Sequence, residues 1–203
     1  MTRTAPAVIA GLVLALVSVP AAAHQAIPGV TGFPAAVLHP LITPEHVLLL
    51  AATALVAGRM EARAYFSAVL AFVAGLMAAR GVLFIITWLS AFWYAPLVAT
   101  LVGGTMVAAF RRIDARAGVA AIFVFGFVLS VGLVPEEMTP RGLMIAVAGA
   151  VVAGLAVMTI VGLPLTRVKS RWGGILIRVA GAWLMAVAII NLALVINMLS
   201  KQS

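Results

Sequence analysis

Apolar runs long enough to cross a lipid bilayer repeat along this chain, separated by short links that carry most of its charge. Inside a bilayer such a run satisfies its backbone polar groups only as a helix or within a closed barrel, and runs of about twenty residues fit helices. With 65% hydrophobic and 9% charged residues, the composition lies outside the range of a soluble domain. The sequence therefore predicts an all-α integral membrane protein.

The N-terminal segment has the organisation of a cleavable signal peptide. A short basic start is followed by an apolar stretch, and Pro20 precedes three alanines that satisfy the small-x-small cleavage rule. We expect a signal peptide over residues 1–23 and a single transmembrane domain over residues 24–203. Cleavage after Ala23 would make His24 the new terminus, where it either chelates a metal with its α-amine or binds nothing.

We expect a bundle of six transmembrane helices in that domain. The clearest helix start is Thr43-Pro44-Glu45, since Thr is a common N-cap, Pro fits the first helical position and an acidic group complements the positive helix end. A half-buried or re-entrant piece over about residues 33–41 precedes it, because the first apolar run is short for a full span. The expected helices cover about residues 44–58, 64–86, 95–110, 117–134, 142–163 and 173–199.

The distribution of basic residues predicts the topology. Three links that alternate with nearly uncharged ones hold eight of the thirteen Lys and Arg residues: Arg59, Arg63, Arg111, Arg112, Arg116, Arg167, Lys169 and Arg171. The positive-inside rule assigns these links to the cytoplasm. We therefore expect a multi-pass protein of the bacterial inner (plasma) membrane with its mature N-terminus and its C-terminus outside the cytoplasm, and no nucleic-acid partner.

All three histidines, His24, His39 and His46, fall on the outer face in this topology. The last two frame the string His39-Pro40-Leu41-Ile42-Thr43-Pro44-Glu45-His46. Because the chain has no cysteine, a metal site must use His, carboxylate, Met, backbone or terminal-amine ligands. His39, Glu45 and His46 suit nickel, cobalt, zinc or copper(II). Alternatively, Glu45 complements the helix end and His46 satisfies the exposed amides there.

Three further charged residues lie toward the same face. Glu136 and Glu137 form a charged loop that is either a collecting patch, a second shell or ligand for the metal, or a solvated link. Arg80 falls within an expected helix, where a charge requires a partner. Pairing of Arg80 with Glu45 or with the Glu136-Glu137 loop would let it gate the metal site.

The sequence predicts no enzyme activity and no tightly bound cofactor, because it holds no nucleotide-binding loop, no nucleophile elbow and no second catalytic centre. The metal would be transported or transiently bound. Three functions stay open at this point: a transition-metal permease, a non-transporting metal-binding accessory or assembly protein, for which copper is a further candidate metal, and a structural membrane subunit.

The chain resembles the HupE/UreJ family of hydrogenase and urease accessory membrane proteins. The resemblance rests on the signal peptide followed by His24, on His39-Pro40 and Glu45-His46 leading into a Leu-rich helix, and on the closing segment of residues 174–183. Family members typically show His-Pro, a Gly and then Asp-His at this spacing, whereas Thr43 replaces the Gly here and Glu45 the Asp.

The resemblance implies a six-helix, permease-like protein that admits nickel, or cobalt, for metalloenzyme maturation. Carried over position by position, it makes His39, Glu45 and His46 the metal-contacting residues. Its expected partners are the lipid bilayer, a transition-metal ion and a metalloenzyme maturation system.

Overall fold

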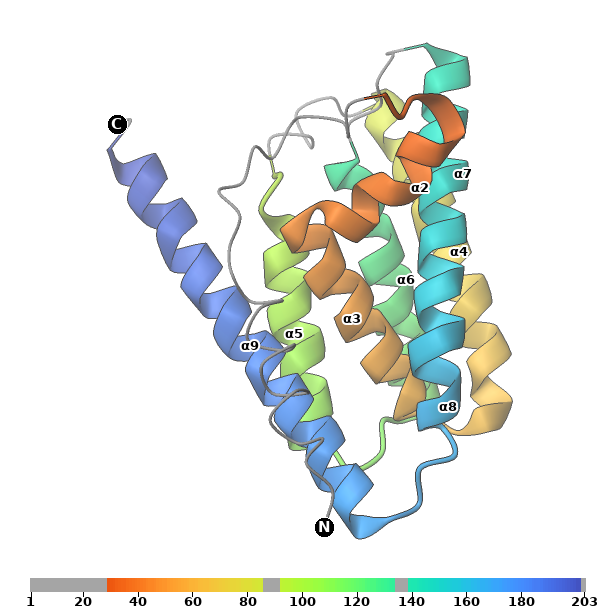
Figure 1. Cartoon of the computed structure of the whole chain (residues 1–203), viewed down its shortest axis with the longest axis vertical. Helices are drawn as coiled ribbons and strands as arrows, with labels where there is room; N and C mark the ends of the chain where they lie inside the picture. Colours follow the sequence, from red (N-terminus) through yellow and green to blue (C-terminus); the bar gives the residue numbers. More distant parts are fainter. Residues whose placement is uncertain (1–28, 86–91, 134–138, 202–203) are drawn as a thin grey trace.

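A computed structural model gives the structure of this chain and describes residues 29–85, 92–133 and 139–201 (Figure 1). These residues form helices joined by short links, with no strand among them, which confirms the all-α class. The expected signal peptide over residues 1–23 lies outside the described ranges. His24, Glu136 and Glu137 also lie outside them.

The helices follow one another along the chain without any intervening domain. Their bounds are α2 Gly32–Ile42, α3 Pro44–Gly58, η1 Ala62–Ala64, α4 Tyr65–Ile85, α5 Ala95–Ala109, α6 Ala115–Gly132, α7 Pro140–Val157, η3 Met158–Gly162, α8 Leu163–Leu165 and α9 Arg171–Ser200. Here η1 is a 3₁₀ turn and η3 is a π-helical segment. Helix α2 occupies the region where the sequence predicts a re-entrant piece.

Helices α2 and α3 meet at an angle of 76°. Thr43 lies between them in an extended conformation, with φ −78° and ψ 116°, as expected for a residue that precedes proline. Its hydroxyl donates to the His39 carbonyl over 2.7 Å and makes no capping hydrogen bond to α3. The expected side-chain cap is therefore absent, and Thr43 instead ties the end of α2 to the start of α3.

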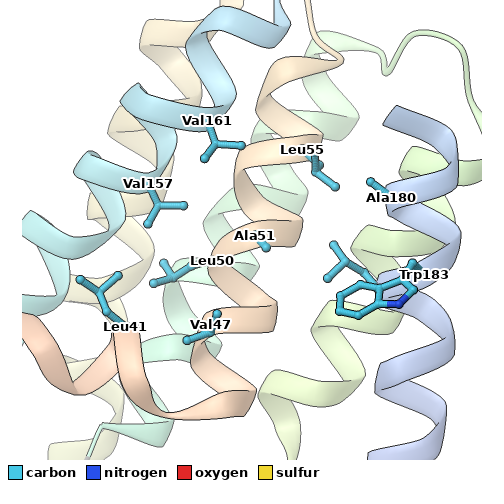
Figure 2. Close-up of a pocket in the computed structure, with 10 residues that line it drawn as sticks. Leu41, Val47, Leu50, Ala51, Leu55, Val157, Val161, Ala180 and Trp183 are labelled. Carbon is cyan, nitrogen blue, oxygen red and sulfur yellow. The ribbon is translucent and has the colours of Figure 1, made fainter. Parts of the chain in front are cut away.

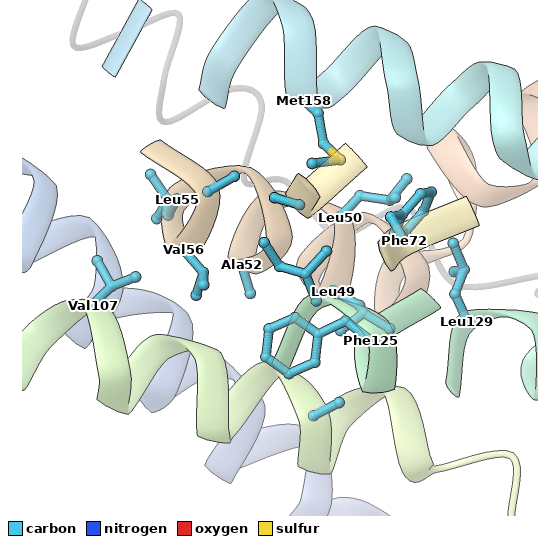
Figure 3. Packing of buried hydrophobic residues seen from close by; sticks show 14 of the residues in the cluster. Leu49, Leu50, Ala52, Leu55, Val56, Phe72, Val107, Phe125, Leu129 and Met158 are labelled. Carbon is cyan, nitrogen blue, oxygen red and sulfur yellow. The ribbon is translucent and has the colours of Figure 1, made fainter. Parts of the chain in front are cut away.

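Helix α3 lies at the centre of the bundle, in contact with α5, α6, α7, α9 and η3 (Figure 1). Its Leu49, Leu50 and Val56 are buried and pack against apolar side chains from neighbouring helices (Figure 3). These partners include Phe72 of α4 and Phe125 of α6. In a bilayer, where lipid tails are as apolar as leucine, such contacts stabilise the bundle mainly through van der Waals packing.

Two glycines allow the close approach of α4 and α6. A Cβ atom at Gly75 would lie 2.0 Å from the Phe123 carbonyl oxygen, and one at Gly126 would lie 2.2 Å from the Phe72 carbonyl oxygen. No side chain fits at either position without moving a backbone. Small residues at helix contacts are common in membrane bundles for this reason.

The helix expected over about residues 142–163 contains a π-helical segment. This segment begins at Met158, six residues before Pro164. Proline has no backbone N–H, and its ring clashes with the carbonyl four residues earlier, so the preceding turn widens. The Tyr65 hydroxyl donates to the Met158 carbonyl at the start of this segment, which links α4 to η3.

The structure contains four helices that are long and apolar enough to cross a membrane, among the residues it describes: Ala62–Val82, Ala115–Gly132, Pro140–Leu165 and Arg171–Ser200. The bent pair of α2 and α3 makes a fifth candidate span if it is counted as one. Helix α5 is apolar but has only 15 residues. The chain is a multi-pass membrane protein, and the count of six spans remains a prediction.

The basic links gather at one end of the bundle, which we call the basic end (Figure 1). There Arg59 Nη2 donates to the Phe110 carbonyl over 2.8 Å, and the Ile113 amide donates to the Arg59 carbonyl over 3.1 Å. Burial, together with the positive charges of Arg178 and Arg111, lowers the pKa of the Arg59 guanidinium. Helix α2 and the start of α3 lie at the opposite end (Figure 1).

Candidate metal centre

His39 and His46 come together at the bend between α2 and α3. Their ring centroids are 5.5 Å apart, and the ring planes meet at 61°. On one straight helix, seven residues correspond to about 10 Å of rise, so the 76° bend shortens the separation between these positions. The bend at Thr43 and Pro44, which we call the elbow, therefore brings the two histidine rings together.

The His46 ring occupies a closed pocket in which only 2% of the residue is exposed. A Cβ atom at Gly132, the last residue of α6, would lie 2.6 Å from His46 Nε2 and 3.4 Å from Pro96 Cγ. The ring thus fits because position 132 has no side chain. Its Nδ1 atom is buried and has no hydrogen-bond partner among the described residues, which leaves one imidazole nitrogen to bind a ligand.

His39 is half-buried in the last turn of α2. Its backbone carbonyl accepts hydrogen bonds from both the amide and the hydroxyl of Thr43, over 3.0 Å and 2.7 Å. These two bonds satisfy a carbonyl at the helix end that has no partner within α2. They hold the backbone of His39 at a fixed place relative to α3.

Glu45 is half-buried and forms no hydrogen bond or ion pair with the part of the chain that the structure describes. It precedes His46 in α3 and therefore projects about 100° around the helix from it. No group of three or more His, Cys, Asp or Glu residues in residues 29–85, 92–133 and 139–201 is placed to hold a metal ion. The structure brings the two histidines together but does not bring Glu45 to them.

Arg80 of α4 pairs with backbone carbonyls at the end of α6 rather than with Glu45. Its Nη2 donates to the Ser130 carbonyl over 2.8 Å and to the Leu133 carbonyl over 3.3 Å. A cation at this position complements the negative end of the helix dipole. The ion pair found among the described residues is Arg63 with Glu61, at the basic end.

The end of α6 connects Arg80 to the histidine pair. Ser130 and Leu133 bind the guanidinium, and Gly132 between them contacts the His46 ring. The Ser130 hydroxyl and Arg80 Nε are buried there without hydrogen-bond partners within the described chain. Sequence reasoning missed Ser130 and Gly132, and the available signal was only that both stand at the end of an apolar run.

The other candidate residues, His24, Glu136 and Glu137, lie outside the described ranges. Their roles as ligand, second shell or collecting patch therefore stay predictions.

Comparison with known proteins identifies one matching family model. The model described as HupE / UreJ protein matches residues 12–191, which include both His39 and His46. No curated protein and no solved structure matches the chain.

Proposed function

We propose that this chain, which belongs to the HupE/UreJ family of nickel- or cobalt-related accessory membrane proteins, is a transition-metal permease. In this proposal, His39 and His46 capture a divalent ion, nickel or cobalt, at the outer face of the bacterial inner membrane. The bundle then passes the ion toward the basic end, which faces the cytoplasm by the positive-inside rule. The family is an accessory or permease-type family rather than a known enzyme family.

The observation that carries this proposal is the 5.5 Å separation between the two imidazole centroids. Imidazole nitrogens bind such ions at about 2 Å, so two rings on one ion have centroids roughly 5 to 6 Å apart. The observed separation is therefore compatible with two rings on one ion. Imidazole is also a ligand type that suits nickel, copper and zinc.

Two imidazoles do not complete a coordination shell, so the proposal needs further ligands. Glu45 lies next to His46 in the sequence, and rotation of its half-buried side chain would bring a carboxylate toward the elbow. His24 and water are the other ligands that we propose. The negative end of the α2 dipole and the positive end of the α3 dipole meet at this bend, so the helix dipoles do not by themselves favour a cation there and the ligands must supply the affinity.

A second candidate function is metal binding without transport. It is favoured by the interior below the elbow, where α3 presents Leu49, Leu50 and Val56 to other apolar side chains. The buried hydroxyls of Thr53 and Thr100 donate to carbonyls of their own helices over 2.8 Å, so they are engaged rather than open to an ion. A protein of this kind would hold metal at the outer face and deliver it to a metalloenzyme maturation system.

Uptake of nickel, cobalt, zinc and copper into reconstituted vesicles separates the two functions. We compare the unaltered protein with the His39→Phe/His46→Phe variant, which keeps an aromatic ring at both positions and loses both ligands. The permease proposal predicts nickel or cobalt flux that the variant loses. Metal binding with no flux in the unaltered protein would favour the accessory function, and equal flux in both proteins would contradict the role of the histidines.

A further inference from the structure

A second site is suggested by a groove that runs along α3 between the η3 side of the bundle and α9 (Figure 2). Its volume is about 290 Å³ and its walls are apolar. The residues that matter here come from four elements: Ala51 and Leu55 of α3, Val157 of α7, Val161 of η3, and Ala180 and Trp183 of α9.

The groove exists because α9 packs mainly against α5 and leaves its side toward α3 largely open. It leans along α5, where Gly181 lies against Val107, and it makes few contacts with α3 (Figure 1). Trp183 points from α9 toward α3 and closes part of the space between them (Figure 2). The rest of the groove remains open along helices that are long enough to cross a membrane.

The link between α8 and α9 crosses the basic end of this groove, because it joins the two walls. It carries Arg167, Lys169 and, at the start of α9, Arg171, and all three are exposed. The sequence contains no Asp or Glu from Met138 to its end, and the acidic groups of the other links at the basic end, Glu61 and Asp114, form no ion pair with these three cations. Three exposed cations therefore lie on the link beyond the basic end of an apolar groove, and none of them has an ion-pair partner among the described residues.

Trp172 stands beside these cations and is 76% exposed. Tryptophan is enriched at the level of lipid headgroups, where its ring contacts acyl chains and its N–H contacts polar groups. Its position at the start of α9 thus marks the depth at which headgroups meet the groove.

We propose that the groove and the α8–α9 link together bind one anionic phospholipid. An acyl chain lies along Leu55, Val161 and Ala180, and the phosphate lies against the cations of the link. Guanidinium groups bind phosphate oxygens through charge-assisted hydrogen bonds, and basic pockets between transmembrane helices are known to hold anionic headgroups. A helix of a second copy is a poorer occupant, because a helix with side chains is about 10 Å across.

This inference does not rest on the metal proposal, and its test does not involve metal. The protein is purified from vesicles of phosphatidylcholine and phosphatidylglycerol, and the retained lipid is counted by native mass spectrometry. We expect one phosphatidylglycerol per chain, retained in excess inorganic phosphate, and no retained phosphatidylcholine. Equal retention of both lipids, or displacement by phosphate, would overturn the proposal.

Charge variants test the headgroup site. We expect Arg167→Gln/Lys169→Gln/Arg171→Gln to weaken binding of phosphatidylglycerol about a hundredfold, from roughly 1 kcal/mol for each of three cations. The matched control removes three charges from another link at the basic end: Arg111→Gln/Arg112→Gln/Arg116→Gln. Equal losses in the two variants would show a general attraction of the charged surface and would contradict a specific site.

A pair of tryptophan variants tests the groove itself. Val161→Trp fills the groove and should abolish retention of the lipid, whereas Ile160→Trp, at a position that is 74% exposed and outside the groove, should leave it unchanged. Unchanged retention in Val161→Trp, or a disulfide that joins two copies carrying Val161→Cys, would overturn the assignment of the groove to a lipid chain. The charge variants decide the question independently if Val161→Trp does not fold.

Discussion

His46 Nε2 faces the backbone of Gly132 so closely that a Cβ atom added at Gly132 would lie 2.6 Å from it. The first turn of α3 and the last residue of α6 therefore fit together because position 132 has no side chain. This contact fixes the place of the ring, and the ring is half of the proposed metal pair. A substitution at either residue should therefore alter the affinity of the metal site.

Gly132→Ala should displace the His46 ring and weaken nickel binding. Overpacking of a filled interior costs about 1–3 kcal/mol, so we expect a lower thermal midpoint together with a lower nickel affinity. Gly174→Ala is the control, because a Cβ atom there meets nothing within 4 Å. Titration calorimetry and thermal unfolding measure both effects, and nickel affinity equal to that of the control would contradict the contact.

Arg80→Gln should destabilise the bundle, because it removes a charged donor from the Ser130 and Leu133 carbonyls. Loss of a hydrogen bond from a charged group costs about 1.5–3 kcal/mol. Arg80→Lys should recover part of this, since it keeps the cation at the helix end. Arg141→Gln, which removes an exposed charge near the start of α7, should leave the thermal midpoint nearly unchanged. The same midpoint in Arg80→Gln as in Arg141→Gln would refute the role of Arg80.

Thr43→Val should loosen the elbow, because it removes the 2.7 Å hydrogen bond from the Thr43 hydroxyl to the His39 carbonyl. The expected cost is about 0.5–1.5 kcal/mol of stability, with a matching loss of nickel affinity as the two rings separate. Thr43→Ser keeps the hydroxyl and should behave like the unaltered protein. Chemical denaturation and nickel titration of both variants test this, and identical behaviour of Val and Ser would count against it.

Glu45→Gln tests whether the carboxylate completes the metal shell. If Glu45 moves to the ion, removing its charge should weaken nickel binding, while Glu45→Asp, the residue typical of the family at this position, should retain it. Nickel titration at constant pH gives the comparison. A Glu45→Gln variant with full affinity would remove Glu45 from the ligand set and leave the histidine pair untouched.

Local rules account for the parts of this fold that depend on neighbouring residues. Thr43-Pro44-Glu45 predicts a helix start, and α3 begins at Pro44 because proline restricts both its own backbone and that of Thr43. The short apolar run before Gly58 predicts a preceding re-entrant piece, and α2 lies there. The all-α class follows from apolar runs that allow no other backbone arrangement in lipid.

Features that depend on contacts between residues far apart in the sequence could not be predicted from the sequence alone. Arg80 was expected to pair with Glu45 or with the Glu136-Glu137 loop, which lies outside the described residues. It does not pair with Glu45, because the end of α6 offers carbonyls without helical partners, and a sequence pattern does not reveal such acceptors. The contact of Gly132 with His46 joins residues 86 positions apart by the packing of two helices. The histidine pair itself was foreseeable, since both rings flank one predicted helix start.

Whether His39 and His46 bind one metal ion together is decided by a double-mutant cycle in nickel affinity. Titration calorimetry would compare the unaltered protein, His39→Phe, His46→Phe and the double variant. Two ligands of one ion act as a unit, so each single variant should lose most of the affinity and the double variant little more. Losses that add would indicate separate sites, and unchanged affinity in the double variant would contradict the proposed metal centre.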